Sequence, residues 1–384
     1  MKRKVCVLVT ARPSYSRIKS ALIAIDNHPD LELQLVVGAS ALLERYGNTI
    51  YSIEHDGFNI AARVYMILEG ENLVTSAKST GLGLVELATV FDNLRPDVVV
   101  TVADRYETLA TAVAASYMNV PVAHVQGGEV TGSIDDKVRH AVTKFSDLHF
   151  VSTAKARERV IRLGECEERV FLTGCPSIDV AKEVRTDPVL NFDPFAKYGG
   201  VGSRIDLSDG FLVVLQHSVT TEYDEARGQV EETLNAVAGL DHPTLWFWPN
   251  VDAGSDGTSK GIRIFREQHR DARIHLFRNM FPEDFIRLLL NCSCIVGNSS
   301  VAIRECSFLG VPAVNIGSRQ HGRERGRNVI DVDYDRAAIC DAIKRHLVDD
   351  RPPQDTIYGD GDAGVRIADL LATEELTIEK RLTY

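Results

Sequence analysis

The feature that most constrains this fold is the alternation of short β-branched runs with helical patterns along almost the whole chain. Such runs are typical of strands buried on both faces, and the helical patterns between them supply the crossovers that parallel strands require. The sequence therefore predicts an α/β fold of parallel layers. The first-half strand candidates are Lys4–Thr10, Leu33–Val37, Asp97–Val102, Val120–Val125, His149–Val151 and Val170–Leu172, with helical patterns at Ser14–Asp26, Leu73–Leu94, Arg105–Met118 and Ile134–Phe145.

The periodicity lapses over residues 184–209, where two prolines, three glycines and four aspartates occur without regular apolar spacing. Such a segment is typical of a linker between domains. A second strand–helix series follows, and 384 residues are enough for more than one core. We therefore expect two Rossmann-like doubly wound domains facing a cleft, residues 1–183 and 210–362, joined by the linker and followed by a C-terminal helical segment, 363–384. The second-series strand candidates are Phe211–Leu215, Leu245–Phe247, Arg273–Phe277, Cys294–Val296 and Ala313–Ile316.

Charge and apolar content argue against several classes of protein. Acidic side chains outnumber basic ones by 54 to 43, and the resulting net charge of −11 argues against a nucleic-acid-binding surface. No run approaches the roughly 20 apolar residues of a membrane span, and Val5–Val9 is too short for the apolar core of a signal peptide. We expect a cytoplasmic protein without a membrane or nucleic-acid partner. The seven cysteines are scattered and odd in number, which favours reduced thiols and predicts no metal site.

A segment near the end of the second series combines the groups with which proteins bind phosphate. A buried-strand pattern runs into Asn298-Ser299-Ser300, where a helical pattern begins, so backbone N–H groups, hydroxyls and a helix N-terminus converge. The next strand end brings Ser318 and Arg319, and a Gly/Arg-rich loop adds Arg323. Guanidinium groups suit a diphosphate because each binds two phosphate oxygens. By itself, the Gly/Arg-rich loop would be interpreted as a solvated basic loop. Because it is expected next to the Asn-Ser-Ser turn, we predict an anion site instead.

Acidic side chains follow two strand candidates of the first half. Asp104 and Arg105 end the third candidate, and Glu129 follows a Gly-Gly turn after the fourth. Because the carboxyl ends of parallel strands meet at one edge of a sheet, Asp104, Glu129 and Asp135 or Asp136 are expected to converge. Crowded carboxylates raise one another's pKa, which prepares one of them to transfer a proton. The alternative is that Asp104 and Arg105 only begin a helix, and that the paired aspartates only stabilise a helix N-terminus.

Other strand ends also carry polar side chains. Arg12 and Ser14 follow the first strand candidate; helix capping accounts for Ser14, while a nucleotide or sugar contact is one of two interpretations of Arg12. His217 follows the first strand of the second series among hydroxyl residues, which favours a pyrophosphate contact or a general acid. Asn250 and Asp252 follow the next strand and are candidate substrate contacts.

Two common nucleotide motifs are absent. No G-x-x-x-x-G-K-[ST] occurs, so the sequence does not predict a P-loop NTPase. Gly81-x-Gly83 lacks a third glycine and does not follow a strand, so a dinucleotide site is not supported either. The sequence predicts no cofactor.

Taken in order, the motifs resemble those of hydrolysing UDP-N-acetylglucosamine 2-epimerases of the sialic-acid pathway, a family that includes the epimerase half of a bifunctional animal enzyme. The resemblance runs from about residue 4 to residue 345. It implies a glycosyltransferase-B-like pair of Rossmann-type domains, a UDP-sugar held mainly through UDP by the second domain, and a homodimer or homotetramer. It also implies that a C-terminal helix, Ala363–Leu371, packs on the first domain. The matching stretches are ARPSYS, RYGNTI with IEHDGFNI, VADRYE, HVQGGEVTGSIDDKVRHAVTK, LTGCPSID, LQHSVTT, WPNVDAGS, VGNSSVAIRE and IGSRQHGRERGRNVI.

The resemblance also implies roles for single residues. Its phosphate, nucleotide and ribose contacts match Arg12, Ser14, His217, Ser299, Ser300, Glu305, Arg319 and Arg323, and its catalytic or sugar-side positions match Asp104, Arg105, Glu129 and Asp136.

Gln126 departs from the family pattern, because several relatives carry a glutamate at this position. Glutamine cannot act as a base, so Gln126 is expected to be a substrate contact and either Glu129 or Asp104 to remove the proton. We favour Glu129. The first loop differs as well, since Pro13 and Ser14 follow Arg12 where many relatives have an acidic residue nearby.

The mechanism that the resemblance implies is elimination followed by hydration. A carboxylate removes the C2 proton while UDP leaves C1, and water then adds to the resulting glycal with inversion at C2, giving N-acetylmannosamine. The GGE-x-x-G-x-IDD pattern favours this hydrolysing branch. The alternatives are the same chemistry on UDP-2,4-diacetamido-2,4,6-trideoxyglucose, a non-hydrolysing epimerase, a glycosyltransferase of the same fold, and a nucleotide-sugar sensor without turnover.

Overall fold

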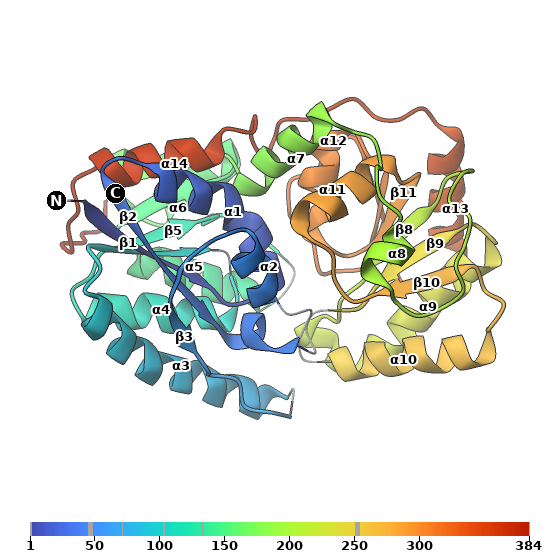
Figure 1. Ribbon diagram of the computed structural model, residues 1–384, viewed down its shortest axis with the longest axis horizontal. Helices are drawn as coiled ribbons and strands as arrows, with labels where there is room; N and C mark the ends of the chain where they lie inside the picture. The colour runs from blue at the N-terminus through green and yellow to red at the C-terminus, as the bar shows by residue number, and fades with distance from the viewer. Residues whose placement is uncertain are drawn as a thin grey trace. The chain divides into compact units, whose positions relative to one another are not determined.

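The chain forms two compact α/β units in the computed structural model, which describes residues 2–44, 49–70, 72–102, 104–131, 134–249 and 254–383. The first unit comprises Met1–Val130, Ile134–Val180 and Tyr358–Tyr384, and the second comprises Thr131–Ser133 and Ala181–Ile357. Each unit is built on one parallel sheet with helices packed against it (Figure 1). The predicted α/β fold with two doubly wound parallel sheets is confirmed.

The first unit has a seven-stranded parallel sheet in the order β3-β2-β1-β4-β5-β6-β7. The chain proceeds from β1 to one edge and then returns to the other side of β1, so the order reverses between β1 and β4. A parallel sheet of this kind offers its ligand site at that point, beyond the carboxyl ends of the strands. The strands are β1 (Arg3–Val9), β2 (Leu31–Gly38), β3 (Ile60–Val64), β4 (Val98–Val102), β5 (Val122–Val125), β6 (Leu148–Val151) and β7 (Val170–Leu172).

The helices of this unit fill the connections between its strands. They are α1 (Arg12–Asn27), α2 (Thr49–His55), α3 (Leu73–Leu94), α4 (Tyr106–Tyr117), α5 (Asp135–Phe145), α6 (Ala154–Arg162), the start of α7 (Pro176–Thr186) and the C-terminal α14 (Ala363–Thr373).

The second unit repeats the pattern with six parallel strands in the order β10-β9-β8-β11-β12-β13, and the order reverses between β8 and β11. Its strands are β8 (Leu212–Leu215), β9 (Thr244–Phe247), β10 (Ile274–Phe277), β11 (Cys294–Gly297), β12 (Ala313–Ile316) and β13 (Val329–Val332). Its helices are α8 (Pro194–Tyr198), α9 (Ala226–Gly239), α10 (Ser255–Gln268), α11 (Pro282–Asn291), α12 (Glu305–Leu309) and α13 (Arg336–Val348).

Residues 184–209, which we expected to form a linker, contain the end of α7 and the short helix α8, and they belong to the second unit. Val201 in this segment forms an antiparallel bridge with Leu276 of β10. The segment thus runs along the second unit and is held to it by backbone hydrogen bonds.

Of the strands next to the reversal points, β4, β8 and β11 are buried along their whole length, and β1 is buried from Val5 onward. Every residue of β4 and of β8 is buried, and the apolar side chains of β1, β4 and β5 share a core with α1 and α14. Continuous burial explains why these strands read as unbroken apolar runs. Charged side chains in these segments are therefore placed just after the strands.

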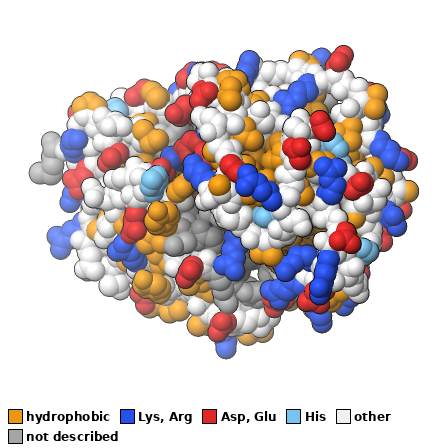
Figure 2. All heavy atoms as spheres, turned by 45° about the vertical axis from the view of Figure 1, so that its right-hand side comes forward, with side chains coloured by type: hydrophobic (Ala, Val, Ile, Leu, Met, Phe, Trp, Pro, Cys, Tyr) orange, Lys and Arg blue, Asp and Glu red, His pale blue; other side chains and the backbone are white. Residues whose placement is uncertain are grey.

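Two surface properties of the protein can be described: the apolar character of its helices and the distribution of charge on one face. Among the described residues, no helix is long and apolar enough to cross a membrane. On the face shown in Figure 2, basic, acidic and apolar side chains are interspersed.

The C-terminal helix α14 packs against α1, at the opposite end of the sequence (Figure 1). The contact is close at Gly364, where an added Cβ would lie 2.6 Å from the backbone carbon of Ser20. The N-terminus of α14 is capped by Asp179, whose carboxylate accepts hydrogen bonds from the N–H groups of Ala363 (3.0 Å) and Gly364 (2.6 Å). Ser20 Oγ donates to the same carboxylate at 2.8 Å. One carboxylate therefore joins α7, α1 and α14.

The segment after α14 is held by a buried ionic cluster around Glu165. Lys380 Nζ and Lys144 Nζ each lie 2.6 Å from a Glu165 carboxylate oxygen, and His149 Nε2 lies 3.1 Å from one. Burial alone would raise the pKa of Glu165, but hydrogen bonds from His149, Lys144 and Lys380 lower it from 4.5 to about 2. Lys380 also donates to the carbonyl of Thr143 at 3.0 Å.

We expect Gly364→Ala to lower the free energy of unfolding by about 1–3 kcal/mol, because the added methyl group would have to displace the backbone of α1. Gly81→Ala is the matched control, since Gly81 lies in α3 and an added Cβ would meet nothing within 4 Å. The control should raise the free energy of unfolding by about 0.5–1 kcal/mol through helix propensity. Urea unfolding measures both; equal stability of the two variants would contradict the close contact.

We expect Lys380→Met to lower the free energy of unfolding at pH 7 by about 2 kcal/mol, the contribution of a hydrogen bond to a charged group. The pKa of Glu165 is lower in the folded state, so the stabilisation is full above pH 4.5 and is lost as the pH falls towards 2. The stability difference between Lys380→Met and the wild type should shrink over that range. Arg381→Met, whose side chain is 87% exposed, is the control and should change little. A difference independent of pH would contradict the role of Glu165.

Candidate functional site

The candidate residues of the first unit lie at the carboxyl ends of adjacent strands. Asp104 and Arg105 follow β4, and Glu129 follows β5 by four residues. The reversal point of the sheet is between β1 and β4, so these ends border the position at which such sheets bind ligands.

Three predicted carboxylate residues meet at one arginine, Arg139 of α5. Its side chain is 1% exposed. Nη1 donates to the backbone carbonyl of Glu129 at 2.8 Å and to the carboxylate of Asp136 at 2.5 Å, and Nη2 donates to the carboxylate of Asp104. The structure therefore brings Asp104, Glu129 and Asp136 together, and it does so through a residue that sequence reasoning did not include in the site.

Asp104 lies between two guanidinium groups. Its second oxygen, Oδ1, is 3.8 Å from Nη1 of Arg17 on α1. Helix α4 begins at Tyr106 with Arg105 at its N-cap, and no side-chain capping bond is made there. The interpretation of Asp104 as a helix cap is therefore wrong, because its carboxylate pairs with arginines instead.

The charge of Arg139 is balanced by its neighbours. Burial by itself would lower the pKa of Arg139, but the carboxylates of Asp104, Glu129 and Asp136 outweigh burial and raise it. The guanidinium group is therefore cationic at neutral pH, and it stands as the fixed counterion of these carboxylates.

A tight turn after β5 determines where Glu129 lies. Gln126 has a φ of 70°, which is uncommon for a residue other than glycine, and its Nε2 donates to Cys175 Sγ at 3.0 Å. Gly128 has a φ of 75°, and an added Cβ would lie 2.2 Å from the carbonyl oxygen of Ala156. Gln126 is buried, and its Oε1 has no hydrogen-bond partner among the described residues; its predicted contact with substrate stays a prediction. Glu129 is 3% exposed.

The remaining candidates of the first unit differ in their surroundings. Ser14 Oγ accepts hydrogen bonds from the N–H groups of Thr10 (3.1 Å) and Ala11 (2.9 Å). Its hydroxyl therefore pairs with the backbone N–H groups that precede α1. Arg12 is the first residue of α1, where the helix dipole disfavours a cation, and this position favours an anionic partner. Arg105 Nε lies 3.3 Å from the carboxylate of Glu107, which is fully buried.

In the second unit, Asn298 joins the two strand ends at the reversal point. Its Oδ1 accepts from the N–H of His217 at 2.7 Å, and its Nδ2 donates to the carbonyl of His217 at 2.8 Å. Asn298 is fully buried. This reciprocal pair fixes the main chain after β8 against the main chain after β11, and it places His217 beside Ser299. The motif containing Asn298 was noted in the sequence, but its role in holding His217 was not.

The backbone carbonyl of Asn298 accepts hydrogen bonds from two side chains that follow β12. Arg319 Nη1 donates to it at 3.3 Å, and Gln320 Nε2 donates at 2.9 Å. Ser299 caps the short helical turn Ser300–Ala302, where its hydroxyl accepts from the N–H of Val301. The structure thus brings the Asn-Ser-Ser turn and the residues after β12 together, as the sequence predicted for an anion site.

The other predicted residues of the second unit that the structure describes are Ser318, Glu305 and Arg323. Ser318 Oγ donates to the carboxylate of Glu222, and Gln229 Nε2 donates to the same carboxylate at 2.7 Å. Glu222 has non-helical backbone angles at a kink within Thr220–Glu225, and it was not among the predicted site residues. Glu305 begins α12, and Arg323 is buried in the loop after β12.

Asn250 and Asp252, the other predicted substrate contacts, lie outside the described residues. Among the residues that are described, no group of three His, Cys, Asp or Glu side chains is placed to hold a metal ion.

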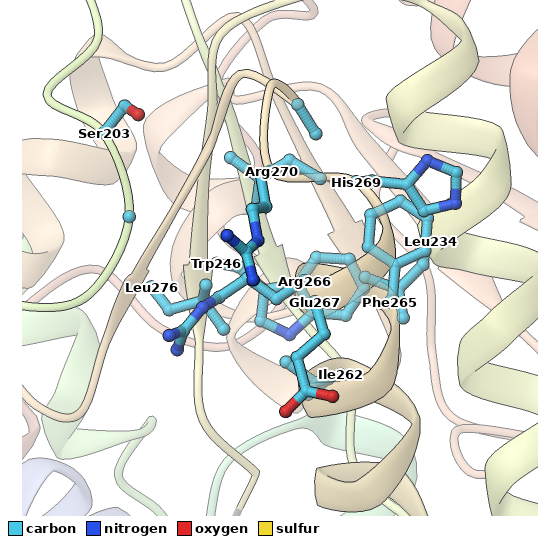
Figure 3. Close-up of a pocket in the computed structure, with 13 residues that line it drawn as sticks. Ser203, Leu234, Trp246, Ile262, Phe265, Arg266, Glu267, His269, Arg270 and Leu276 are labelled. Carbon is cyan, nitrogen blue, oxygen red and sulfur yellow. The ribbon is translucent and has the colours of Figure 1, made fainter.

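A cavity of about 300 Å³ lies elsewhere in the second unit (Figure 3). It is bordered by β9 and β10 and by the end of α10, and the side chains of Arg266 and Arg270 stand beside its apolar lining. Trp246 is fully buried there, and its indole N–H has no partner among the described residues. None of the predicted site residues lines this cavity, so the candidate site is at the strand ends.

Known proteins resemble the chain over nearly its full length. A UDP-N-acetylglucosamine 2-epimerase of Neisseria meningitidis serogroup B is 27% identical over 94% of this chain and 92% of that protein. The UDP-N,N'-diacetylbacillosamine 2-epimerase (hydrolyzing) of Legionella pneumophila is 33% identical over 97% of this chain and 96% of that protein.

The fold also matches solved structures. The crystal structure of the Methanocaldococcus jannaschii UDP-GlcNAc 2-epimerase in complex with UDP-GlcNAc and UDP superposes with a TM-score of 0.78 at 19% identity, covering 97% of this chain and 100% of that one. The family model of UDP-N-acetylglucosamine 2-epimerase matches residues 23–372. The chain therefore belongs to the UDP-N-acetylglucosamine 2-epimerase family.

Proposed function

We propose that this protein is a hydrolysing 2-epimerase of a UDP-linked 2-acetamido sugar, with UDP-2,4-diacetamido-2,4,6-trideoxyglucose as the first candidate substrate. The observation that carries the proposal is the set of acidic residues around the buried Arg139, because proton abstraction from carbon needs an oriented base. The substrate follows the name of the 33% identical Legionella protein, whose sugar, diacetylbacillosamine, is this diacetamido sugar.

The proposed reaction has two steps. A carboxylate takes the proton from C2 of the sugar while the bond from C1 to the UDP oxygen breaks, and the electron pair of that bond leaves with UDP. The product is a glycal with a C1=C2 double bond. Water then adds its hydroxyl to C1, and a proton adds to C2 on the opposite face, giving the free 2-epimeric sugar. No oxidant or reductant is required.

We assign the role of base to Glu129. Both carboxylate oxygens of Asp104 face guanidinium groups, Arg139 on one side and Arg17 on the other, and ion pairs would have to weaken before Asp104 accepted a proton. Arg139 Nη1 donates a hydrogen bond to the backbone carbonyl of Glu129, which holds the chain that bears this carboxylate. The two ion pairs support Asp104 as a fixed anion, and we therefore assign proton abstraction to Glu129, the other acidic residue that follows a strand end here.

We assign the UDP leaving group to the second unit. His217 and Ser299 follow the strands at its reversal point, and Arg319 stands beside them through the carbonyl of Asn298. Hydroxyl, imidazole and guanidinium groups in such positions stabilise negative charge as it develops on the diphosphate. The start of α12 adds Glu305, which we assign to the ribose.

UDP-N-acetylglucosamine is the second candidate substrate, as the family model and the Neisseria relative favour it. The chemistry is the same, and the product would be N-acetylmannosamine. The two sugars differ at C4 and C6, so direct competition between them separates the candidates.

We expect proton NMR in D₂O to show conversion of UDP-2,4-diacetamido-2,4,6-trideoxyglucose to UDP and the free 2-epimer with deuterium at C2, without added metal or NAD. A parallel reaction with UDP-N-acetylglucosamine should be slower in kcat/KM. Formation of an intact UDP-linked epimer would instead indicate the non-hydrolysing reaction. Absence of turnover with both sugars would contradict the proposal.

We expect Glu129→Gln to lower kcat by about 10²–10⁴, the usual contribution of a positioned base, with a smaller change in KM. UDP binding measured by calorimetry should stay within a few-fold of the wild type, because the UDP contacts are assigned to the second unit.

The control is Glu158→Gln, which makes the same chemical change at a side chain on α6 that is 64% exposed. It should leave kcat unchanged. Full activity in Glu129→Gln, together with inactivity in Asp104→Asn, would move the role of base to Asp104.

A further inference from the structure

A single buried guanidinium group connects three segments of the first unit. Arg139 belongs to α5, and it binds Asp104 after β4, the carbonyl of Glu129 after β5, and Asp136 one turn earlier in its own helix. The loops after β4 and β5 are far from α5 in the sequence. The two terminal nitrogens of Arg139 connect them through hydrogen bonds.

The burial of Arg139 requires these partners. A buried charge without compensation is costly, and removing one partner of a buried ion pair destabilises a protein because the other charge is left in an apolar environment. Here the exposed fraction of the side chain is 1%, and three acidic residues surround it. The guanidinium group and the carboxylates therefore fix one another.

The fork of the guanidinium group is what allows it to bind several oxygens in defined directions. Nη2 is directed to Asp104, and Nη1 is shared by Asp136 and the backbone of Glu129. A lysine ammonium would retain the charge but not this planar arrangement. Charge and orientation can therefore be separated experimentally by comparing lysine with glutamine at this position.

We propose that Arg139 is a positioning residue, which holds the chain bearing Glu129 against Asp104 and Asp136 and is the fixed counterion of the Asp104 and Asp136 carboxylates. The proposal rests on the proposed function, in which Glu129 is the base. Arg139 acts through the carboxylates and is assigned no contact with the substrate.

The electrostatic surroundings of the cluster come from several elements. Asp136 and His140 share α5 with Arg139, Arg17 approaches Asp104 from α1, and Arg159 of α6 donates to the carbonyl of Gly128 at 3.2 Å. Arg17 and Arg159 remain when Arg139 is replaced. The effect of a substitution at Arg139 therefore reports the loss of this cation, with Arg17 and Arg159 still in place.

The test compares Arg139→Gln with Arg139→Lys in the full chain. Removal of a cation within about 4 Å raises a carboxylate pKa by about 1–3 units. We expect the acidic limb of the pH profile of kcat/KM to move up by about one unit in Arg139→Gln, since the base must be deprotonated to act. Arg139→Lys should move this limb much less, yet lower kcat about 10-fold or more with a smaller change in KM, because the carboxylates lose their fixed positions.

A second measurement needs no turnover. Carbon-13 NMR of the full chain labelled at aspartate carboxyl groups follows the titration of Asp104, with Asp104→Asn to assign the resonance. The apparent pKa of Asp104 should rise in Arg139→Gln and change less in Arg139→Lys. If no sugar is turned over, the proposed function fails, while this titration still decides whether Arg139 controls the carboxylates. If Arg139→Gln does not fold, the lysine variant and its kcat decide the proposal.

The matched controls are Arg157→Gln and Arg157→Lys. Arg157 lies on α6 and pairs with Glu167 at 2.9 Å, outside the cluster. These variants should retain the wild-type kcat, pH profile and Asp104 titration. The proposal is overturned if Arg139→Lys retains the wild-type kcat, or if the acidic limb and the Asp104 titration are the same in Arg139→Gln as in the wild type.

Discussion

Burial of both faces of two parallel sheets is the constraint on which the rest of this structure depends. Because the inner strands β4 and β8 are fully buried, their side chains are mostly apolar, and the charged candidate residues lie in the loops that follow the strands. The reversal of strand order at β1/β4 and at β8/β11 leaves room beyond those ends. Both sets of candidate residues lie there, which is a consequence of the topology.

Each of these edges is organised by one buried polar side chain. Arg139 collects the acidic residues of the first unit, and Asn298 joins the chain after β8 to the chain after β11 in the second. Buried polar groups must be paired, so such a residue restricts the conformations of all its partners at once. In this chain each of the two sets of candidate residues is held by one such side chain.

The fold class was predictable because buried strands give a strong signal. The inner strands β1, β4 and β8 were located within one or two residues, whereas the edge strands β3 and β13 were not predicted. Both edge strands are partly exposed and carry mixed side chains. At the site, Asp104, Glu129 and Asp136 were predicted to converge, but Arg139 was not recognised as the point where they meet. The substrate contact of Gln126 stays a prediction, and the hydrogen bond from its Nε2 to Cys175 Sγ was not foreseen.

The sequence by itself determined the alternation of strands and helices, and with it the strand ends at which polar residues had to lie, because apolar periodicity is a local property of the chain. It also determined which chemical groups are available there. Only the tertiary structure decided which of them are partners. Arg139 is 35 residues from Asp104, and Asn298 is 81 residues from His217. Pairing across such separations depends on strand order and on the burial of both partners, and neither is encoded in the residues near either one.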